Sequence, residues 1–264
     1  MKEINLKAGK KIYFASDFHL GAPDHAGSLI REKKICKWLN SIQPDAQVVF
    51  LMGDLFDFWF EYKELVPKGF SRFLGTLANM SDNGVEIVVF RGNHDMWMLD
   101  FLKNECNATI ISDELKVKIN DQTFYLAHGD GLGPGDKGYK FLKKVFRSPI
   151  SVFLFRYVVP ADLGMRLGKA WASHSWQKHQ KLDDVYVFES KEKEFLYQFC
   201  VEQETIQHHD YYVFGHRHYA LDIPVKEHSR YINLGDWIRF FTYAEFDGQH
   251  MQFKVFEEKS IPLF

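Results

Sequence analysis

Cysteine is scarce in this sequence, and long apolar runs are absent from it. The three cysteines are odd in number, lie far apart and form no C-x-x-C pair; they are Cys36, Cys106 and Cys200. This pattern argues against a disulfide framework and favours a reducing compartment. No apolar run approaches the roughly 18 residues that a membrane-spanning helix needs, and the first residues contain no apolar stretch of the signal-peptide type. We therefore expect a cytosolic protein, which can still lie on a membrane surface.

A strong overall charge is also missing. The formal net charge of −2 gives no general attraction to nucleic acid, and we expect no nucleic-acid partner. The 264 residues are enough for one large domain with a buried core, so we expect residues 1–264 to form a single domain. Aromatic residues are abundant, with 25 Phe, which predicts a large core, an apolar groove, or both. The composition does not indicate an oligomeric state.

Short apolar runs alternate with amphipathic stretches along the chain. The runs predict buried strands at Lys11–Ala15, Gln47–Met52, Glu86–Phe90, Thr123–Ala127, Tyr211–Phe214 and Tyr231–Leu234. The amphipathic stretches predict helices at Ser28–Ser41, Lys68–Ser81 and Phe188–Gln207. Strands that alternate with helices are typical of an α/β fold with crossover connections.

The segment from Lys137 to Lys181 differs from the rest of the chain. It contains ten Lys or Arg and one acidic residue, Asp162, so its formal net charge is +9. Phe, Leu, Val and Trp recur in it at helical spacing. This combination predicts basic amphipathic helices inserted between two core elements. The plainer alternative is a positively charged, solvated surface, and the size of the charge bias favours the first interpretation.

Five short motifs each follow a predicted strand and consist of residue types that bind metals. They are Asp17-Phe18-His19, Gly53-Asp54-Leu55-Phe56-Asp57, Gly92-Asn93-His94-Asp95, His128-Gly129-Asp130 and Gly215-His216-Arg217-His218. In open α/β sheets, ligands bind beyond the carboxyl ends of the strands, so these loops are able to converge. Each motif alone is weak, since Gly, Asn and Asp favour turns in any case. All five together, in this order, predict one site.

The set of motifs resembles the calcineurin-like metallophosphoesterase superfamily, whose pattern is D-x-H, G-D-x-x-D, G-N-H-D/E, H-G and G-H-x-H. The resemblance spans about residues 11 to 240. It implies a four-layer α/β/β/α sandwich with two metal ions at one sheet edge. It also implies two ligand sets that share one carboxylate. The first set is Asp17, His19, Asp54 and His218, and the second is Asp54, Asn93, His128 and His216.

This donor chemistry suits two divalent cations. Carboxylate, amide oxygen and imidazole suit Mn²⁺, Fe²⁺ or Zn²⁺, and the absence of thiolate argues against a structural zinc site. We expect Mn²⁺, with Fe²⁺ and Zn²⁺ as alternatives. Such a pair lowers the pKa of a water and polarises phosphoryl oxygens. The resemblance further implies that His94 lies over the phosphate as a charge stabiliser or general acid, oriented by Asp95.

The residues after the fourth motif indicate one group of enzymes within this superfamily. The segment GLGPGDKGYKFLKKVFRSPISVFLFRYV resembles the basic, aromatic lid of UDP-2,3-diacylglucosamine hydrolases of the lipid A pathway. These enzymes cleave a pyrophosphate to give UMP and 2,3-diacylglucosamine 1-phosphate. The resemblance implies a lid at residues 135–182, a lipid-linked nucleotide as partner, and a peripheral position on an anionic membrane. The lid residues it suggests for substrate contact are Asp136, Ser173, Ser175, Lys178 and Lys181.

One departure leaves alternatives open. Many such hydrolases have G-N-R-D as their third motif, whereas this chain has His94 after Asn93. Either the chain is a variant of the same enzyme, or it is a relative with another substrate. We favour the variant because of the lid. The alternatives are a nucleotide pyrophosphatase or phosphodiesterase with a soluble substrate and, in another class, a metal-free binding scaffold. The complete ligand set argues against the scaffold.

Overall fold

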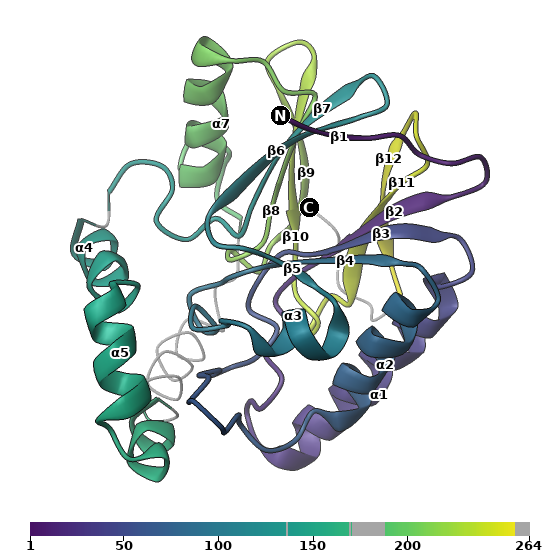
Figure 1. Cartoon of the computed structure of the whole chain (residues 1–264). Helices are drawn as coiled ribbons and strands as arrows, with labels where there is room; N and C mark the ends of the chain where they lie inside the picture. The colour runs from purple at the N-terminus through teal and green to yellow at the C-terminus, as the bar shows by residue number, and fades with distance from the viewer. Residues whose placement is uncertain (136, 169, 171–187, 257–264) are drawn as a thin grey trace.

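Two six-stranded sheets form the centre of the fold (Figure 1). The computed structural model describes residues 1–135, 137–168, 170 and 188–256. One sheet has the order β12-β11-β2-β3-β4-β5, in which β2 to β5 run parallel. Its strands are β2 (Lys11–Ala15), β3 (Ala46–Leu51), β4 (Glu86–Phe90), β5 (Thr109–Ile111), β11 (Thr242–Phe246) and β12 (Met251–Val255).

The second sheet has the order β1-β6-β7-β8-β10-β9, with β7, β8 and β10 parallel. Its strands are β1 (Lys2–Ile4), β6 (Glu114–Ile119), β7 (Gln122–Ala127), β8 (Tyr211–Phe214), β9 (Ala220–Val225) and β10 (Ser229–Leu234). All six strands predicted from the sequence are present. The strands that the apolar runs did not indicate are β1, β5, β6, β9, β11 and β12. They are short, lie at or near a sheet edge, or alternate apolar and polar residues.

Helices cover the outer face of each sheet. The first sheet packs against α1 (His25–Ile42), α2 (Ser71–Asp82) and α3 (Phe101–Cys106), and the second packs against α7 (Phe195–Ile206). Apolar side chains such as Phe14, Phe50 and Phe124 fill the space between the sheets. Strands buried on both faces explain why the strongest runs are continuously apolar. The predicted four-layer α/β/β/α architecture is confirmed.

The helix boundaries differ from the sequence prediction for local reasons. Helix α1 begins early because the Asp24 side chain accepts a hydrogen bond from Gly27 N at 2.8 Å, an N-cap. Helix α2 begins late because Gly69 and Phe70 have φ values of 108° and 60°, which are not helical. The stretch predicted to begin at Phe188 becomes a helix at Phe195, after Glu194 caps its first turn.

Two further helices, α4 (Lys137–Phe146) and α5 (Pro149–Tyr157), stand beside the sandwich, at the left of Figure 1. Residues 161–168 are also helical. All of these lie within the predicted lid at 135–182, and their role as a substrate lid stays a prediction. Among the described helices, none is both long and apolar enough to span a membrane.

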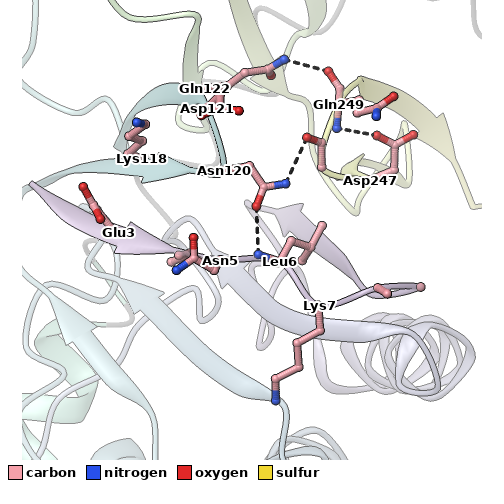
Figure 2. Close-up of a pocket in the computed structure, with 14 residues that line it drawn as sticks. Glu3, Asn5, Leu6, Lys7, Lys118, Asn120, Asp121, Gln122, Asp247 and Gln249 are labelled. Carbon is pink, nitrogen blue, oxygen red and sulfur yellow. Dashed lines mark hydrogen bonds between the residues drawn. The ribbon is translucent and has the colours of Figure 1, made fainter.

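A polar hollow lies at the amino ends of β2 and β7, the edge opposite the five motifs. Figure 2 shows that Asn120 joins two chain segments there: it accepts a hydrogen bond from Leu6 N at 3.0 Å and donates one to Gly248 O at 3.2 Å. Gln122 donates a second bond to Gln249 O at 2.8 Å. These bonds tie the β6–β7 turn to the β11–β12 turn, and so tie one sheet to the other.

Candidate metal centre

The five motifs meet at one edge of the sandwich because their strands run parallel within each sheet. β2, β3 and β4 end at this edge in one sheet, and β7 and β8 end there in the other. Backbone hydrogen bonds join the loops: Asp17 N donates to Gly53 O at 3.1 Å, and Gly215 N donates to His128 O at 2.9 Å. A third bond crosses between the sheets, from Trp237 N to Asp17 O at 3.1 Å.

The first predicted ligand set is brought together. His19 Nε2 and His218 Nε2 lie 3.3 Å apart, and Asp17 Oδ1 lies 3.3 Å from His218 Nε2. Asp54 Oδ2 is 3.7 Å from His19 Nε2. Asp17, His19 and His218 can each offer one ligand atom to a common ion. Two imidazole nitrogens and two carboxylate oxygens form a donor set that divalent transition metals accept.

The second predicted set lies next to the first. His128 Nε2 is 3.3 Å from Asp54 Oδ2 and 3.2 Å from Asn93 Oδ1, and His216 Nδ1 is 2.8 Å from the same amide oxygen. Asp54 Oδ2 therefore faces donor atoms of both sets, while Asp54 Oδ1 accepts a hydrogen bond from His94 N at 2.9 Å. This is the position that a bridging carboxylate needs. All seven predicted ligands are gathered at one place, and their role as ligands stays a prediction.

Among the four histidines predicted as ligands, three have Nδ1 close to an oxygen atom that lies on the side of the ring away from the other predicted ligands. His128 Nδ1 donates to Met52 O at 2.8 Å, and His218 Nδ1 lies 3.2 Å from Asp236 Oδ2. His19 Nδ1 lies 3.6 Å from Asp57 Oδ1. In the neutral form of each ring, such outer contacts favour the tautomer that leaves Nε2 as a lone-pair donor. The arrangement is the one found around metal-binding histidines.

The backbone of the centre is strained. Five predicted ligands have left-handed φ values between 44° and 67°: Asp17, His19, Asp54, His216 and His218. Each such residue costs of order 1–3 kcal/mol, so the surrounding fold must hold it in place. Gly53 allows a close approach of the second motif to His128, because a Cβ atom there would lie 2.6 Å from His128 Nδ1. A larger residue at Gly53 is incompatible with the position of His128.

The structure corrects the role we expected for Asp95. We expected its carboxylate to orient His94, but it accepts backbone hydrogen bonds from Gly92 N at 2.8 Å and Leu55 N at 2.7 Å, and longer ones from Asp54 N and Phe56 N. Asp95 therefore ties the second and third motif loops together. The His94 ring instead contacts Asp57, through a 2.9 Å hydrogen bond from Nδ1 to the Asp57 carbonyl oxygen.

The electrostatics of the centre favour positive charge. Burial lowers the pKa of His19, but Asp17, Asp57 and Asp54 outweigh it and raise that pKa to about 10. Burial likewise opposes protonation of His128, whose pKa Asp54 and Asp17 raise to about 10. His216 is the opposite case, since burial and the charge of His128 lower its pKa to about 3. The raised pKa values of His19 and His128 therefore show that the carboxylates attract positive charge to the donor cluster, where a cation could replace the protons.

Two acidic residues belong to the site although sequence reasoning assigned them no role. Asp236 contacts His218 and follows β10 in a strand-Gly-Asp pattern, the same signal that marks Asp54 after β3. Asp130, in the fourth motif, is 3% exposed; it accepts a hydrogen bond from Tyr139 Oη at 2.7 Å and pairs with Lys143 Nζ at 2.8 Å. It thereby fastens α4 to the loop that carries His128.

The predicted substrate contacts in the lid lie outside the described residues. They are Asp136, Ser173, Ser175, Lys178 and Lys181. The described part of the segment is held at its root by the Asp130 contacts and by aromatic packing. The ring of Phe155 lies 4.5 Å from that of Phe60 and stacks on Trp97 at 5.7 Å.

The chain is similar in sequence to known proteins, and more distantly similar in structure to others. The family model described as calcineurin-like phosphoesterase matches residues 10–220. A UDP-2,3-diacylglucosamine hydrolase from Porphyromonas gingivalis is 37% identical over 257 residues, which cover 94% of this chain and 98% of that protein. One from Pseudomonas fluorescens is 28% identical over 219 residues, covering 80% and 83%. A solved dimetal phosphatase from Danio rerio has a TM-score of 0.43 and 13% identity, covering 94% and 96%.

Replacing the shared carboxylate tests the two ligand sets together. We expect Asp54→Ala to lose both cations and to lower hydrolysis by several orders of magnitude, because both sets need this group. Metal content of the purified variant, measured by mass spectrometry, checks the first part. Asp222→Ala, which removes an aspartate paired with Arg230 on the edge strand β9, is the control and should keep both metals. An Asp54→Ala protein with normal metal content and turnover contradicts the assignment.

The pKa values of His19 and His128 predict how metal binding depends on pH. Both rings are protonated up to about pH 10 in the metal-free protein, so each cation must displace a proton. We expect the affinity for Mn²⁺ to fall about tenfold per site for each unit that the pH is lowered between 9 and 7. Calorimetric titration of the metal-free protein at three pH values measures this slope. A flat profile would mean that the rings are neutral before metal binds.

Proposed function

The chain belongs to the calcineurin-like phosphoesterase family and is a metal-dependent hydrolase, and from this we propose that it cleaves the pyrophosphate of UDP-2,3-diacylglucosamine. The products are UMP and 2,3-diacylglucosamine 1-phosphate. The observation that carries the proposal is the 37% identity to a protein of that name over nearly the full length of both chains. The gathered donor set around Asp54 supports the same chemistry.

We propose the following roles for the residues of the centre. Asp17, His19, Asp54 and His218 hold one cation, and Asp54, Asn93, His128 and His216 hold the other. When bound, such a pair supplies a water of lowered pKa and polarises the phosphoryl oxygens. We propose Mn²⁺ as the native ion, because oxygen and imidazole donors without thiolate suit it.

His94 acts on the phosphate rather than on the metals in this proposal. Burial lowers the pKa of His94, so the ring is neutral before substrate binds. Because a carbonyl oxygen only accepts, the bond to Asp57 O requires the proton to sit on Nδ1. Nε2 must then take up a proton to serve as an acid, and a nearby phosphate anion favours that uptake. Protonated His94 can stabilise the developing charge or protonate the leaving oxygen.

The proposed reaction is tested by comparing substrates with Mn²⁺ supplied. We expect UDP-2,3-diacylglucosamine to be cleaved with a far higher kcat/KM than UDP-GlcNAc or a panel of soluble nucleotides. Each buried methylene of an acyl chain contributes about 0.8 kcal/mol, which only the acylated compound can use. Equal efficiency for UDP-GlcNAc would replace the proposal with a soluble-nucleotide pyrophosphatase and would leave the metal centre intact.

Substitution of His94 separates its role from metal binding. We expect His94→Ala to keep both metals but to lose roughly 10²- to 10⁴-fold in rate, the usual size of an acid or charge-stabilising contribution. Metal content and single-turnover rates on the same preparation check both parts. Metal loss like that expected for Asp54→Ala would mean that His94 is a metal ligand. The geometry allows this outcome, because His19, Asp54 and His94 also have ligand atoms close together.

We propose that the segment at 135–182 is a lid over the substrate and docks on an anionic membrane. Polar side chains near α4 contact the protein body, where Lys143 pairs with Asp130 and Arg147 donates to Ser112 O at 2.8 Å, and the Phe155 ring packs there as well. Many other apolar side chains of this segment are exposed. This outer lid face consists of Phe141, Val145, Ile150, Phe153, Leu154, Tyr157, Val158, Leu163 and Leu167, all exposed.

The charge around the outer lid face favours a membrane as its occupant. Lys137, Lys144 and Arg166 are exposed beside the apolar residues. Basic residues near an anionic bilayer contribute about 1 kcal/mol each, and inserted apolar side chains add to this. A lipid-linked substrate is reached from such a surface. The three cysteines are free, which supports a position on the cytoplasmic face of the membrane.

Membrane docking is tested with vesicles. We expect the double variant Phe153→Ser and Leu154→Ser to lose most of its binding to phosphatidylglycerol-containing vesicles, because two side chains that would enter the interface are removed. Ile206→Ser is the matched control, since Ile206 is 72% exposed on α7. Co-sedimentation at low and high salt measures both. Equal binding by the double variant and the control would contradict a role for this face.

A further inference from the structure

Arg217 lies between two predicted ligands of different cations, His216 and His218, and its guanidinium is bound to α7. Nε is 3.1 Å and 3.2 Å from the two carboxylate oxygens of Glu194. The guanidinium carbon lies 4.8 Å from the ring centroid of Phe195 and 5.1 Å from that of Tyr219. Arg217 is therefore held by an ion pair and by two aromatic rings.

The strength of this contact depends on its surroundings. An exposed ion pair contributes little to stability. Glu194, however, is 3% exposed, so its charge needs a partner inside the protein. Glu194 is also the N-cap of α7, where it accepts a hydrogen bond from Leu196 N. The pair thus joins the start of α7 to the loop after β8. Breaking it would leave the charge of Glu194 buried without its partner, which is costly.

The loop itself needs such support. His216 and His218 have φ values of 67° and 54°, and Arg217 N donates to Gly215 O at 2.7 Å, which closes a very tight turn. Left-handed conformations at residues other than glycine persist only where the structure holds them. The His216 ring also packs edge-on against Phe195, 6.3 Å away, so α7 contacts the loop on the ligand side as well.

We propose that Arg217, through its ion pair with Glu194, is a positioning residue that sets the geometry of His216 and His218 for the two cations. The proposal rests on the proposed function only in taking these two histidines as metal ligands. Because one histidine serves each cation, loss of Arg217 weakens both sites together. Asp236 differs in this respect, since its contact is with His218 alone among the ligands.

The test is a Mn²⁺ titration of the metal-free protein, with no substrate present. We expect Arg217→Met to weaken both binding steps by about tenfold or more, the range seen when outer contacts of ligands are removed. Glu194→Gln should weaken both steps similarly. The double variant should be no weaker than the worse single variant, because the two residues act as one unit. Arg217→Lys, which keeps the charge without the planar guanidinium, should restore part of the affinity.

Arg230 provides a matched control within the same sheet. It also pairs with an aspartate, Asp222, with Nε at 3.0 Å from one oxygen, and it also lies over a tyrosine ring, Tyr211, at 5.5 Å. It lies opposite Tyr211 at the start of β8, away from the metal edge. Arg230→Met should lower the melting temperature without changing the affinity for Mn²⁺.

The outcomes are separable. If Arg217→Met and Arg217→Lys both bind Mn²⁺ like the unmodified protein and only the melting temperature falls, the pair merely holds α7 and the proposal is wrong. If KM for the substrate rises while Mn²⁺ affinity stays unchanged, Arg217 contacts substrate and the proposal is also wrong. Failure to cleave UDP-2,3-diacylglucosamine would overturn the proposed function and leave the titration result standing.

Discussion

Two carboxylates, an amide oxygen and four imidazoles gathered within a few ångströms cannot be held by their own interactions. Lone pairs on these groups repel one another unless a proton or a cation stands between them. Asp17 and Asp54 supply the negative charge that raises the pKa of His19 and of His128. The two cations proposed above would satisfy the same constraint more completely, and the position of Asp54 Oδ2, which faces donor atoms of both predicted sets, is consistent with that proposal. The rest of the fold holds these seven side chains close together.

The sandwich achieves this by ending parallel strands of both sheets at one edge. The loops that follow carry left-handed residues whose conformations are costly, and backbone contacts hold them. Asp95 ties the loops after β3 and β4, and the bond from Trp237 N to Asp17 O links the two sheets at the centre itself. Ion pairs extend the same function outward, through Asp130 to α4 and through Arg217 to α7. Elements outside the five motifs thus contact the loops that carry the predicted ligands.

Much of this was predictable from the sequence because continuous apolar runs and strand-turn-ligand motifs are strong signals. β4 and β8 have the predicted boundaries, and all seven predicted ligands lie together. Edge strands such as β9 and β12 were missed because one face of each meets solvent and their apolar pattern is weak. The role of Asp95 was mistaken because adjacency in sequence does not say which backbone groups a carboxylate will meet. Asp236 was missed although its strand-Gly-Asp pattern repeats that of Asp54.

The segment at 135–182 combines contacts to the protein body with many exposed apolar side chains. Its described part is held to the body both by polar contacts to Asp130 and by the packing of Phe155, and other apolar side chains, such as Phe153, remain exposed. Exposed apolar side chains would suit the membrane docking proposed above, whereas the proposed chemistry depends on the metal centre. The most direct measurement of the central claim is anomalous X-ray diffraction from crystals grown with Mn²⁺. The account predicts two peaks about 3.5–4 Å apart, both in contact with Asp54. A single peak, or two peaks that do not share Asp54, would contradict it.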